Sequence, residues 1–283
     1  MRVAVLTDAA SERFIFPFWH KYYGGMFGAK NLFVITYVGL SKNFKNCDLG
    51  GLIELPVGYD DAMRRDVING LVPTLLACYD CLVRVDVDEF LVVDPREQPS
   101  LNSFIECFDQ PYITARGFDV IQLPEEVSLP KDLSRILPYR QVAYPNSALN
   151  KTCIVKSAVK WSSGFHGASV YPKFGALFML HMKRVDIKWQ VEWFAEMTSN
   201  IKDNSRVDQI IKDYYQPDED KIRNYHRDVG VRTIVRGITS WYRQEFTQQY
   251  LNGVALRGDG VYAGRYEHEH VLCEIPREWR DLI

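Results

Sequence analysis

The stretch LVRVDVDEFLVVDP, residues 82–95, sets three acidic side chains, Asp86, Asp88 and Glu89, in an otherwise apolar and β-branched run. Such a run favours a buried strand. An unpaired carboxylate in a low-dielectric interior is very costly. We therefore expect the acids to lie at the end of the strand, where they meet positive charge.

The composition bounds the kind of protein. At 283 residues, with 47% hydrophobic and 13% aromatic residues, the chain can form one large packed domain, with or without a smaller appendage. The net charge of −2 argues against a bulk electrostatic partner, so we expect no nucleic acid. No apolar stretch approaches the about 18 residues of a transmembrane helix. The start, MRVAVLTDAA, has no secretory pattern, so we expect a cytoplasmic protein.

Strand-like and helix-like segments alternate along the first half of the chain. Residues 14–27 and 60–76 carry apolar side chains at helical spacing, and strand-like runs lie at 2–7, 32–38, 52–55 and in the acid-bearing stretch. This order predicts an α/β fold with a mostly parallel sheet and helices on both faces. In such sheets the ligand site lies beyond the carboxyl ends of the strands, where we expect Asp86 and Asp88.

The second half is less regular. Residues 112–123, 151–159 and 176–184 read as strands, and 124–150, with four prolines, predicts a long loop. From about Asp186 the pattern turns helical. We therefore expect a catalytic domain at 1–200 and a mainly helical extension at 201–283 packed on it. Because 221–257 holds seven Lys/Arg against two acids, this extension either docks an anionic acceptor, a membrane surface or a partner subunit, or is a solvated helical cover.

An Asp-x-Asp pair on an extended segment projects both carboxylates to one face. The two charges repel unless a cation lies between them or one is protonated. Oxygen ligands suit Mg²⁺ or Mn²⁺, ions that also bind a diphosphate and can stabilise its departure. Two alternatives share this pattern: an aspartyl-phosphate phosphohydrolase, and two solvated acids paired with Arg84. A dinucleotide fingerprint, a P-loop and a nucleophile elbow do not occur.

A histidine pair lies near the end of the chain. The segment YEHEHV, residues 266–271, places His268 and His270 on one face of an extended run. This spacing suits either a second metal site or an edge strand with polar side chains.

Four segments carry a resemblance to a known family. They are LLACYDCLVRVDVDEFLVVDP (75–95), SERFIFPFWHKYYGGMFGAKNLFVITY (11–37), KTCIVKSAVKWSSGFHG (151–167) and FMLHMKRVDIKWQVEWF (178–194). Together they resemble the family 2-like glycosyltransferases of the GT-A fold, in the subgroup whose metal motif reads DVDEF. The likeness covers roughly residues 1–200. It departs at Tyr22-Tyr23-Gly24, where the subgroup has Tyr-His.

The resemblance implies a Rossmann-related fold and a set of site residues. Asp86, Asp88 and His181 would hold the metal, with Asp86 also near the donor's ribose and Asp88 at the diphosphate. The remaining donor contacts it implies are Thr7 and Asp8 beside the nucleotide base, and Arg13, Arg64 or Arg65 at the phosphates. These assignments have structural alternatives: the histidine would be hydrogen-bonded within the core, or the arginines would lie on a solvated helix face.

A catalytic base is not evident, since no Glu-Asp pair follows the motif at the spacing usual for inverting enzymes of this fold. An acceptor hydroxyl must lose its proton as it attacks the anomeric carbon. His166 has a suitable unperturbed pKa and is our first candidate, and Asp119 is the second. A reaction with retention of configuration would need neither.

These observations together predict a Mn²⁺- or Mg²⁺-dependent glycosyltransferase. Its expected donor is a nucleotide-diphosphate sugar, a UDP-sugar first, and its expected acceptor a hydroxyl of a glycan or glycolipid-type molecule. The alternatives are a metal-dependent phosphohydrolase and a non-catalytic nucleotide- or carbohydrate-binding module.

Overall fold

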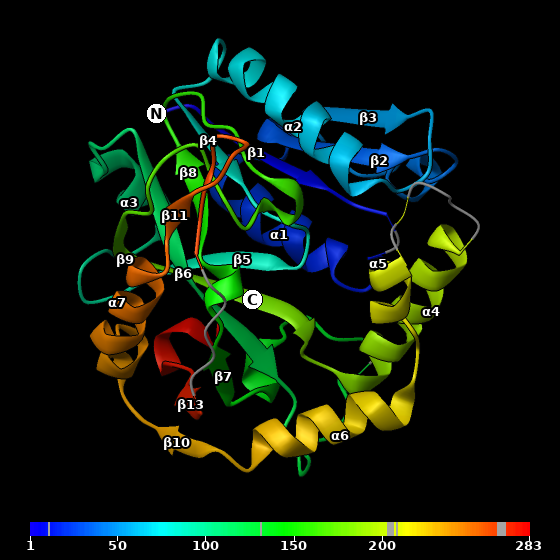
Figure 1. The fold of residues 1–283 in the computed structure, drawn as a ribbon, viewed down its shortest axis with the longest axis vertical. Coiled ribbons are helices and arrows are strands. Elements are labelled where there is room, and N and C mark those ends of the chain that lie inside the picture. Colours follow the sequence, from blue (N-terminus) through cyan, green and yellow to red (C-terminus); the bar gives the residue numbers. More distant parts are fainter. Residues whose placement is uncertain (11, 131, 203–206, 208, 265–269) are drawn as a thin grey trace.

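A computed structural model describes residues 1–283 except 11, 131, 203–206, 208 and 265–269. Its centre is a mixed sheet of eleven strands with helices on both faces (Figure 1). The order along the sheet is β10-β13-β7-β6-β8-β4-β1-β2-β3, and β9 pairs with both β6 and β5. The predicted α/β class, with a mixed sheet flanked by helices, is therefore confirmed.

The parallel half of the sheet comes from the first 84 residues. It consists of β1 (Val3–Asp8), β2 (Leu32–Tyr37), β3 (Gly51–Leu55) and β4 (Cys81–Arg84), with β1 between β4 and β2. Every residue of β1 is buried, as expected for a central strand covered on both faces. The carboxyl ends of β1 and β4 therefore lie side by side.

The other strands turn the sheet antiparallel. β8 (Lys151–Val155) runs antiparallel to β4 and to β6 (Tyr112–Ile121), and β7 (Val142–Pro145) runs antiparallel to β6. β9 (Phe174–Arg184) lies parallel to β6 and antiparallel to β5 (Glu89–Val93). The acidic motif therefore lies where the chain passes from β4 to β5.

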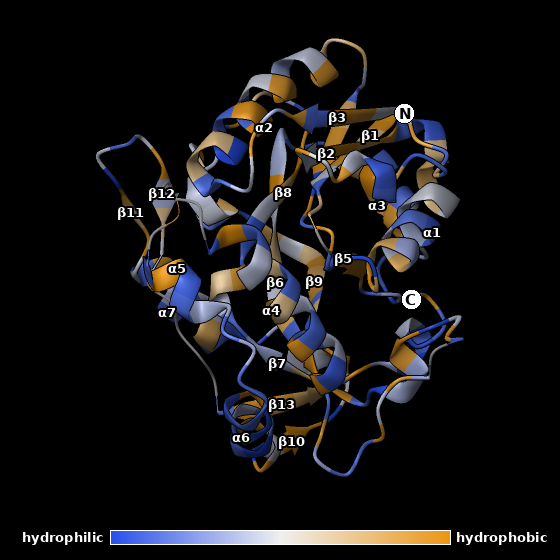
Figure 2. Ribbon diagram, turned by 90° about the vertical axis from the view of Figure 1, so that its right-hand side faces the viewer, coloured by the Kyte–Doolittle hydropathy of each residue, from blue (hydrophilic) through white to orange (hydrophobic). Residues whose placement is uncertain are grey.

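The two largest hydrophobic clusters of the described residues lie on the two faces of the sheet. Helices α1 (Phe16–Phe27) and α3 (Leu101–Cys107) bury Trp19, Tyr23 and Ile105 in one core. Helices α2 (Asp61–Leu76) and α4 (Ile187–Ile201) bury Val72 and Met197 in the other. Figure 2 shows β1 and β2, which are largely apolar, between α2 on one side and α1 and α3 on the other. Side chains of Asp60 and Asp186 cap α2 and α4 by accepting from backbone N–H groups.

The region after residue 200 contains the predicted helices and also completes the sheet. Its helices are α5 (Gln209–Tyr214), α6 (Glu219–Gly230) and α7 (Gln244–Asn252). Two short strands that the sequence pattern did not indicate, β10 (Thr233–Val235) and β13 (Val271–Glu274), extend the main sheet beyond β7. β11 (Ala255–Leu256) and β12 (Tyr262–Ala263) form a hairpin. Of the histidine pair before β13, His268 lies outside the described residues.

Among the described residues, no helix is both long and apolar enough to cross a bilayer.

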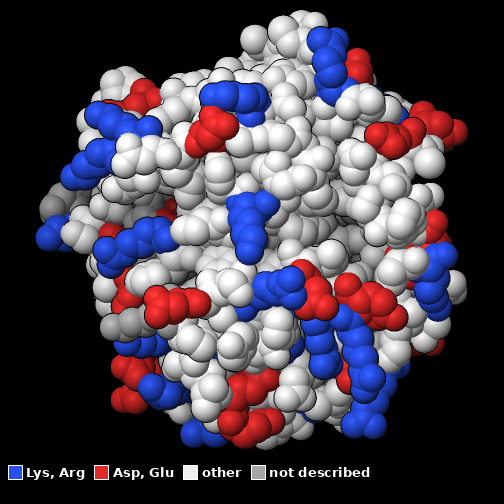
Figure 3. All heavy atoms as spheres, turned by 180° about the vertical axis from the view of Figure 1, so that it is seen from behind, with Lys and Arg blue, Asp and Glu red and all other residues white. Residues whose placement is uncertain are grey.

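Charges of both signs are interspersed on the surface. On the face shown in Figure 3, Lys and Arg side chains alternate with Asp and Glu, and no continuous field of one sign forms. Several basic residues of the C-terminal region have acidic neighbours, as in the pair Arg223–Glu219 on α6. The excess of basic residues in this stretch of sequence is thus partly offset in the folded chain.

Candidate active site

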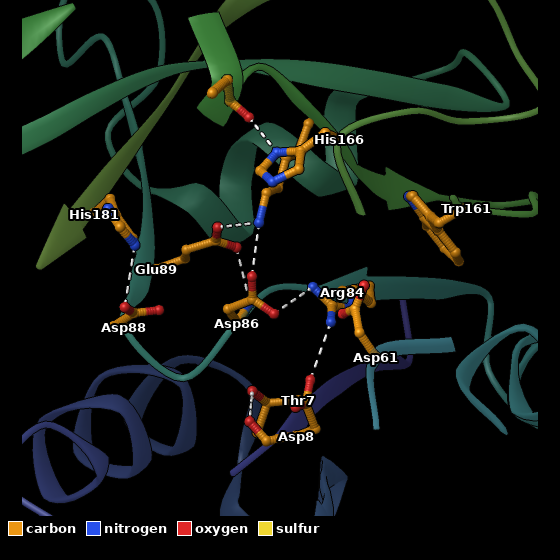
Figure 4. Close-up of polar contacts among 12 residues, drawn as sticks. Thr7, Asp8, Asp61, Arg84, Asp86, Asp88, Glu89, Trp161, His166 and His181 are labelled. Atoms are coloured by element: carbon orange, nitrogen blue, oxygen red, sulfur yellow. Dashed lines mark hydrogen bonds and ion pairs between the residues drawn. The ribbon is translucent and has the colours of Figure 1, made fainter. Parts of the chain in front are cut away.

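The acidic motif forms a turn at the carboxyl end of β4. Asp86 and Glu89 close it reciprocally: the Asp86 N–H donates to Glu89 Oε2 at 2.8 Å, and the Glu89 N–H donates to the Asp86 carbonyl at 3.0 Å. The side chains of Asp86 and Asp88 point to different partners (Figure 4). As expected, the acids lie at a strand end and meet positive charge. The carboxylates of Asp86 and Asp88 do not converge on one point, however, where a single ion could bind both.

Three cationic side chains converge on the Asp86 carboxylate. Arg64 Nη2 and Arg84 Nη1 each lie 2.9 Å from Oδ1, and Lys151 Nζ lies 2.6 Å from Oδ2. Burial alone would raise the pKa of Asp86, but these cations outweigh it and hold the pKa well below its usual range. Asp86 is therefore a half-buried, ionised centre of an ion-pair network.

The same two arginines also hold Asp8 at the end of β1. Arg84 Nη2 lies 3.1 Å and Arg64 Nε 3.4 Å from the Asp8 carboxylate, and the Tyr37 hydroxyl donates to it at 3.2 Å. Arg84 is 1% exposed, so its charge acts on neighbouring side chains and not on solvent. The ends of β1 and β4 are thus joined by buried ion pairs.

Phe165 covers these arginines. The centroid of its ring lies 3.4 Å from Arg84 Cζ and 4.7 Å from Arg64 Cζ, within the range of cation–π attraction. Its backbone has a φ of +59°, which is rare for a bulky residue, and the preceding Gly164 also has a positive φ. A backbone held in this region marks a place where the surrounding structure enforces a geometry.

Lys151, the first residue of β8, joins Asp86 to Glu89. Its Nζ lies 2.6 Å from an oxygen of each carboxylate. Burial and the neighbouring Asp86 charge raise the pKa of Glu89, while the pKa of Lys151 is raised because its two carboxylates outweigh burial. The carboxylates of Asp8, Asp86 and Glu89 thus face Arg64, Arg84 and Lys151, and a fourth carboxylate, that of Asp61, lies 3.8 Å from Arg64 Nη1.

A second arrangement links Asp88, His181 and Asp119. His181 Nε2 lies 3.1 Å from Asp88 Oδ2, and its Nδ1 lies 2.5 Å from Asp119 Oδ1. Burial opposes a charged imidazole, but the two carboxylates raise the pKa of His181 to about 10. Asn146 donates to the other oxygen of Asp119 at 2.8 Å, and the pKa of Asp119 falls to about 2. Asp119 therefore orients His181 and is poorly suited to take a proton.

His166 lies beside this network but is a weak base. Its Nδ1 lies 2.5 Å from the Ala148 carbonyl, and the ring is half-buried. Burial, reinforced by the charge of Lys151, lowers the pKa of His166 to about 3. An imidazole of that basicity has little driving force to deprotonate a hydroxyl at neutral pH.

The side chains of three further residues from the resemblance do not bond to the carboxylates of this network. Thr7 is fully buried, and its hydroxyl donates to the Asp8 carbonyl. Arg13 pairs with Glu196 of α4 at 2.5 Å. Arg65 bonds to Asp66 and Ser163 at the surface. Among the three arginines predicted at the phosphates, the structure brings only Arg64 into the site.

Some residues of the site escaped the sequence analysis. A cavity of about 30 Å³ beside Asp88 is lined by Glu12 and Lys183 among others. Burial, together with the charges of Asp8 and Asp88, raises the pKa of Glu12 to about 7. Nothing in the segment around Glu12 distinguishes it in the sequence. Lys151 had a signal, since a charge at the head of an apolar strand is unusual.

The site offers few side chains that could bind a divalent ion. In the described part of the chain, no group of three or more His, Cys, Asp or Glu side chains is arranged to hold a metal unaided. Asp88 and His181 nevertheless fit two positions, because their facing atoms converge and Asp119 fixes the outer nitrogen of the imidazole, as is usual for a ligating histidine. A Mg²⁺-like ion keeps substrate oxygens and water as its remaining ligands. The oxygens of Asp86 are already engaged by cations.

Comparison with known proteins gives a distant likeness and no family. No family model matches the chain, and no curated protein matches it. Among solved structures, one that matches is described as a mannose-1-phosphate geranyltransferase from Thermus thermophilus, over 76% of this chain and 67% of that one. The identity is 11% and the TM-score is 0.31. At this level the similarity says nothing about what this chain does.

Proposed function

We propose that this chain is a metal-dependent glycosyltransferase that moves a sugar from a UDP-sugar to a hydroxyl of a glycan or glycolipid-type acceptor. The observation that carries the proposal is the Asp88–His181–Asp119 arrangement beside Asp86, at the carboxyl ends of β1 and β4. Ligand sites of open α/β sheets lie at such ends. The DVDEF resemblance supports the reaction class.

Asp88 and His181 are the residues that would hold Mn²⁺ or Mg²⁺. When bound there, the ion supplies positive charge that offsets the charge developing on the departing diphosphate. Asp119 keeps His181 Nε2 directed toward Asp88, through a hydrogen bond to Nδ1 that Asn146 steadies from the far side. The metal affinity therefore rests on the turn that carries Asp88 and on the register between β6 and β9, which carry Asp119 and His181.

The ion-pair network around Asp86 has a different task. Its arginines are almost wholly buried, and Arg84 in particular cannot reach a ligand. They fix the end of β4 against the end of β1, so that the turn carrying Asp88 needs no reorganisation when the donor binds. Such preorganised charge is the usual source of transition-state stabilisation in enzymes. Asp86, the most exposed member of the network, remains close enough to the surface to accept a hydrogen bond from a ribose hydroxyl.

The phosphohydrolase alternative is disfavoured by the contacts of Asp86. In that mechanism the first Asp of the motif attacks phosphorus with a carboxylate oxygen. Here Oδ1 faces two guanidinium groups and Oδ2 faces an ammonium group, all within 2.9 Å. These contacts stabilise the carboxylate as an ion and lower its nucleophilicity. The other alternative, a non-catalytic binding module, would bind a nucleotide or carbohydrate without converting it.

A turnover screen tests the proposal. The chain is incubated with UDP-, GDP- and ADP-sugars in the presence of Mn²⁺, and release of the nucleoside diphosphate is measured, with p-nitrophenyl phosphate as a parallel substrate. We expect release from one nucleotide class, lost in Asp88→Asn and kept in the exposed control Asp109→Asn. Hydrolysis of p-nitrophenyl phosphate alone would support the phosphohydrolase, and nucleotide binding without release would support the binding module.

A further inference from the structure

A cavity of about 400 Å³ lies between α1, the end of β5 and the last residues of the chain. Its wall is predominantly apolar and includes Phe18, Tyr22 and Met26 of α1, Val93 of β5, and Trp279. Figures 1 and 2 both place the C-terminus beside α1 and β5. Small-molecule sites usually occupy about 300–1,000 Å³ and are lined mainly by apolar side chains. The size and the lining of this cavity therefore fit a bound ligand.

The polar atoms of the two aromatic residues Tyr22 and Trp279 are already engaged by the backbone. The Tyr22 hydroxyl donates to the Leu91 carbonyl at 2.6 Å, and Trp279 Nε1 donates to the Val93 carbonyl at 2.9 Å. An oxygen of the terminal carboxylate, at Ile283, accepts hydrogen bonds from two backbone N–H groups. The charged side chains that line the cavity are all exposed, with two of each sign: Lys21, Arg135, Glu278 and Asp281. Charge inside an apolar cavity is costly without a partner, so this cavity suits an uncharged aliphatic group.

Helix α1 has two apolar faces. Trp19 and Tyr23 form one face and are fully buried in the core. Phe18, Tyr22 and Met26 form a second face on successive turns, and each of them is only half-buried. A helix at the surface of a protein usually carries polar side chains away from its core face. An apolar face left partly exposed beside a cavity is typical of a binding site.

This second face of α1 leads toward Asp88. The ring centroid of Phe18 lies 6.3 Å from that of Trp189, which stacks on Phe14 at 5.6 Å. Phe14 and Trp189 in turn line the small cavity beside Asp88. Met26 lies twelve positions after Phe14, which corresponds to about 18 Å at the rise of an α-helix. Apolar side chains therefore connect the candidate active site with the large cavity over the length of a long alkyl chain.

We propose that the large cavity binds the aliphatic chain of a glycolipid-type acceptor, whose sugar head lies toward Asp88. The inference rests on the proposed glycosyltransferase function. It narrows the acceptor from a glycan or glycolipid to an amphiphile with a long, uncharged tail. Each methylene group of that tail that leaves water for the cavity favours binding. The tail thus supplies affinity at a distance from the reacting hydroxyl.

Gly25 of α1 offers a way to fill the cavity without disturbing the fold. It lines the cavity and is exposed, and a Cβ added there meets nothing within 4 Å. Gly25→Leu should therefore fold, because leucine favours a helix more than glycine does, and its side chain should occupy part of the cavity. Gly70 of α2 is also exposed, with the same open space, but does not line the cavity. Gly70→Leu is thus the matched control.

The test uses matched pairs of glycosides, in which each sugar carries either a methyl or a tetradecyl group. Each is offered below its micellar concentration, with Mn²⁺ and the nucleotide sugar from which the chain releases nucleoside diphosphate. The readout is the Michaelis constant of the glycoside. We expect the ratio of these constants, methyl over tetradecyl, to be about 10 or more in the unaltered chain and in Gly70→Leu. In Gly25→Leu the ratio should fall to about 2 or less, because the tail loses its space.

A second measurement does not depend on turnover. The methyl resonance of Met26, assigned by its absence in Met26→Leu, is followed as tetradecyl glycosides, methyl glycosides and tetradecanoate are added in turn. We expect a tetradecyl glycoside to shift it at the lowest concentration, and the methyl glycosides to leave it in place.

The outcomes separate the inference from the proposed function. Equal ratios of Michaelis constants in Gly25→Leu and Gly70→Leu, or no shift of the Met26 resonance with any tetradecyl glycoside, would overturn the inference alone. Tighter binding of tetradecanoate than of every tetradecyl glycoside would assign the cavity to a fatty acid and also overturn it. A shift without release of nucleoside diphosphate from any donor would instead overturn the proposed function, and with it the acceptor role of the cavity.

Discussion

Lys151 Nζ lies 2.6 Å from a carboxylate oxygen of Asp86 and equally close to one of Glu89, so that a single ammonium group joins the first and last acids of the DVDEF motif. Glu89 is fully buried, and Lys151 is 5% exposed. Neither carboxylate could remain charged in this interior without a cation. The motif is therefore organised first as a folded ion-pair network, onto which Asp88 is added.

Replacing Lys151 with Met should destabilise the fold by about 3–5 kcal/mol, because two buried carboxylates lose their shared partner. The exposed Lys160 provides the matched control, and Lys160→Met should change stability by less than about 0.5 kcal/mol. Urea unfolding at pH 7 measures both. Adding Glu89→Gln to Lys151→Met should recover part of the loss, and equal losses for the two Met variants would contradict the network.

Substitutions of Asp86 and Asp88 should differ in how much they lower the free energy of unfolding. Asp86→Asn leaves Arg64, Arg84 and Lys151 facing a neutral group, and should lower the free energy of unfolding by about 3 kcal/mol or more. Asp88→Asn leaves His181 paired with Asp119 and should cost less stability. Unfolding curves of the two variants, collected side by side, decide this. A larger loss for Asp88→Asn would reverse the assignment of roles.

The stability of the fold should depend on pH through His181. Its pKa is raised from about 6.5 to about 10 on folding, so the stabilising contribution is fully present below pH 6.5 and is lost as pH rises through 10. The free energy of unfolding should thus decline between pH 7 and 10 more steeply in the unaltered chain than in His181→Gln. Denaturant midpoints with chelator present measure the two slopes, and parallel slopes would show that His181 is not charged in the fold.

Phe165 should stabilise the arginine pair beyond its hydrophobic burial. Phe165→Leu keeps an apolar side chain and the same backbone cost but removes the aromatic face, and we expect a loss of about 2 kcal/mol. Phe174 is the control, since its ring lies 5.1 Å from Arg116 at a partly exposed site. Thermal or urea unfolding of both Leu variants gives the comparison, and a smaller effect at position 165 than at 174 would count against the cation–π contact.

The position of the acidic motif could be predicted from the sequence alone. An apolar, β-branched run that ends in Asp86 can only place its acids at the strand end, and the alternating strands and helices before it predict a parallel sheet. His181 was identified through resemblance, and the structure gives it two carboxylate partners. The region after residue 200 was predicted to be mainly helical, and in the structure it also contributes β10 and β13 to the main sheet.

The partners of these residues could not be predicted, because they depend on strand register. Lys151 and Asp86 are 65 positions apart in the sequence. They meet because β8 pairs with β4 in the register that sets Leu82 beside Val155. Asp119 meets His181 because the two are register partners on β6 and β9. Glu12 has no local sequence signal, because the residues around it in the cavity come from distant parts of the chain, β9 and α4.

Calorimetric titration of UDP, GDP and ADP, with Mn²⁺ and then with chelator, tests the central claim most directly. The account predicts that UDP binds only when the metal is present and that Asp88→Ala abolishes this binding while the variant remains folded. If no nucleotide binds under either condition, or if UDP binds equally well with chelator and without Asp88, the proposed glycosyltransferase site is contradicted.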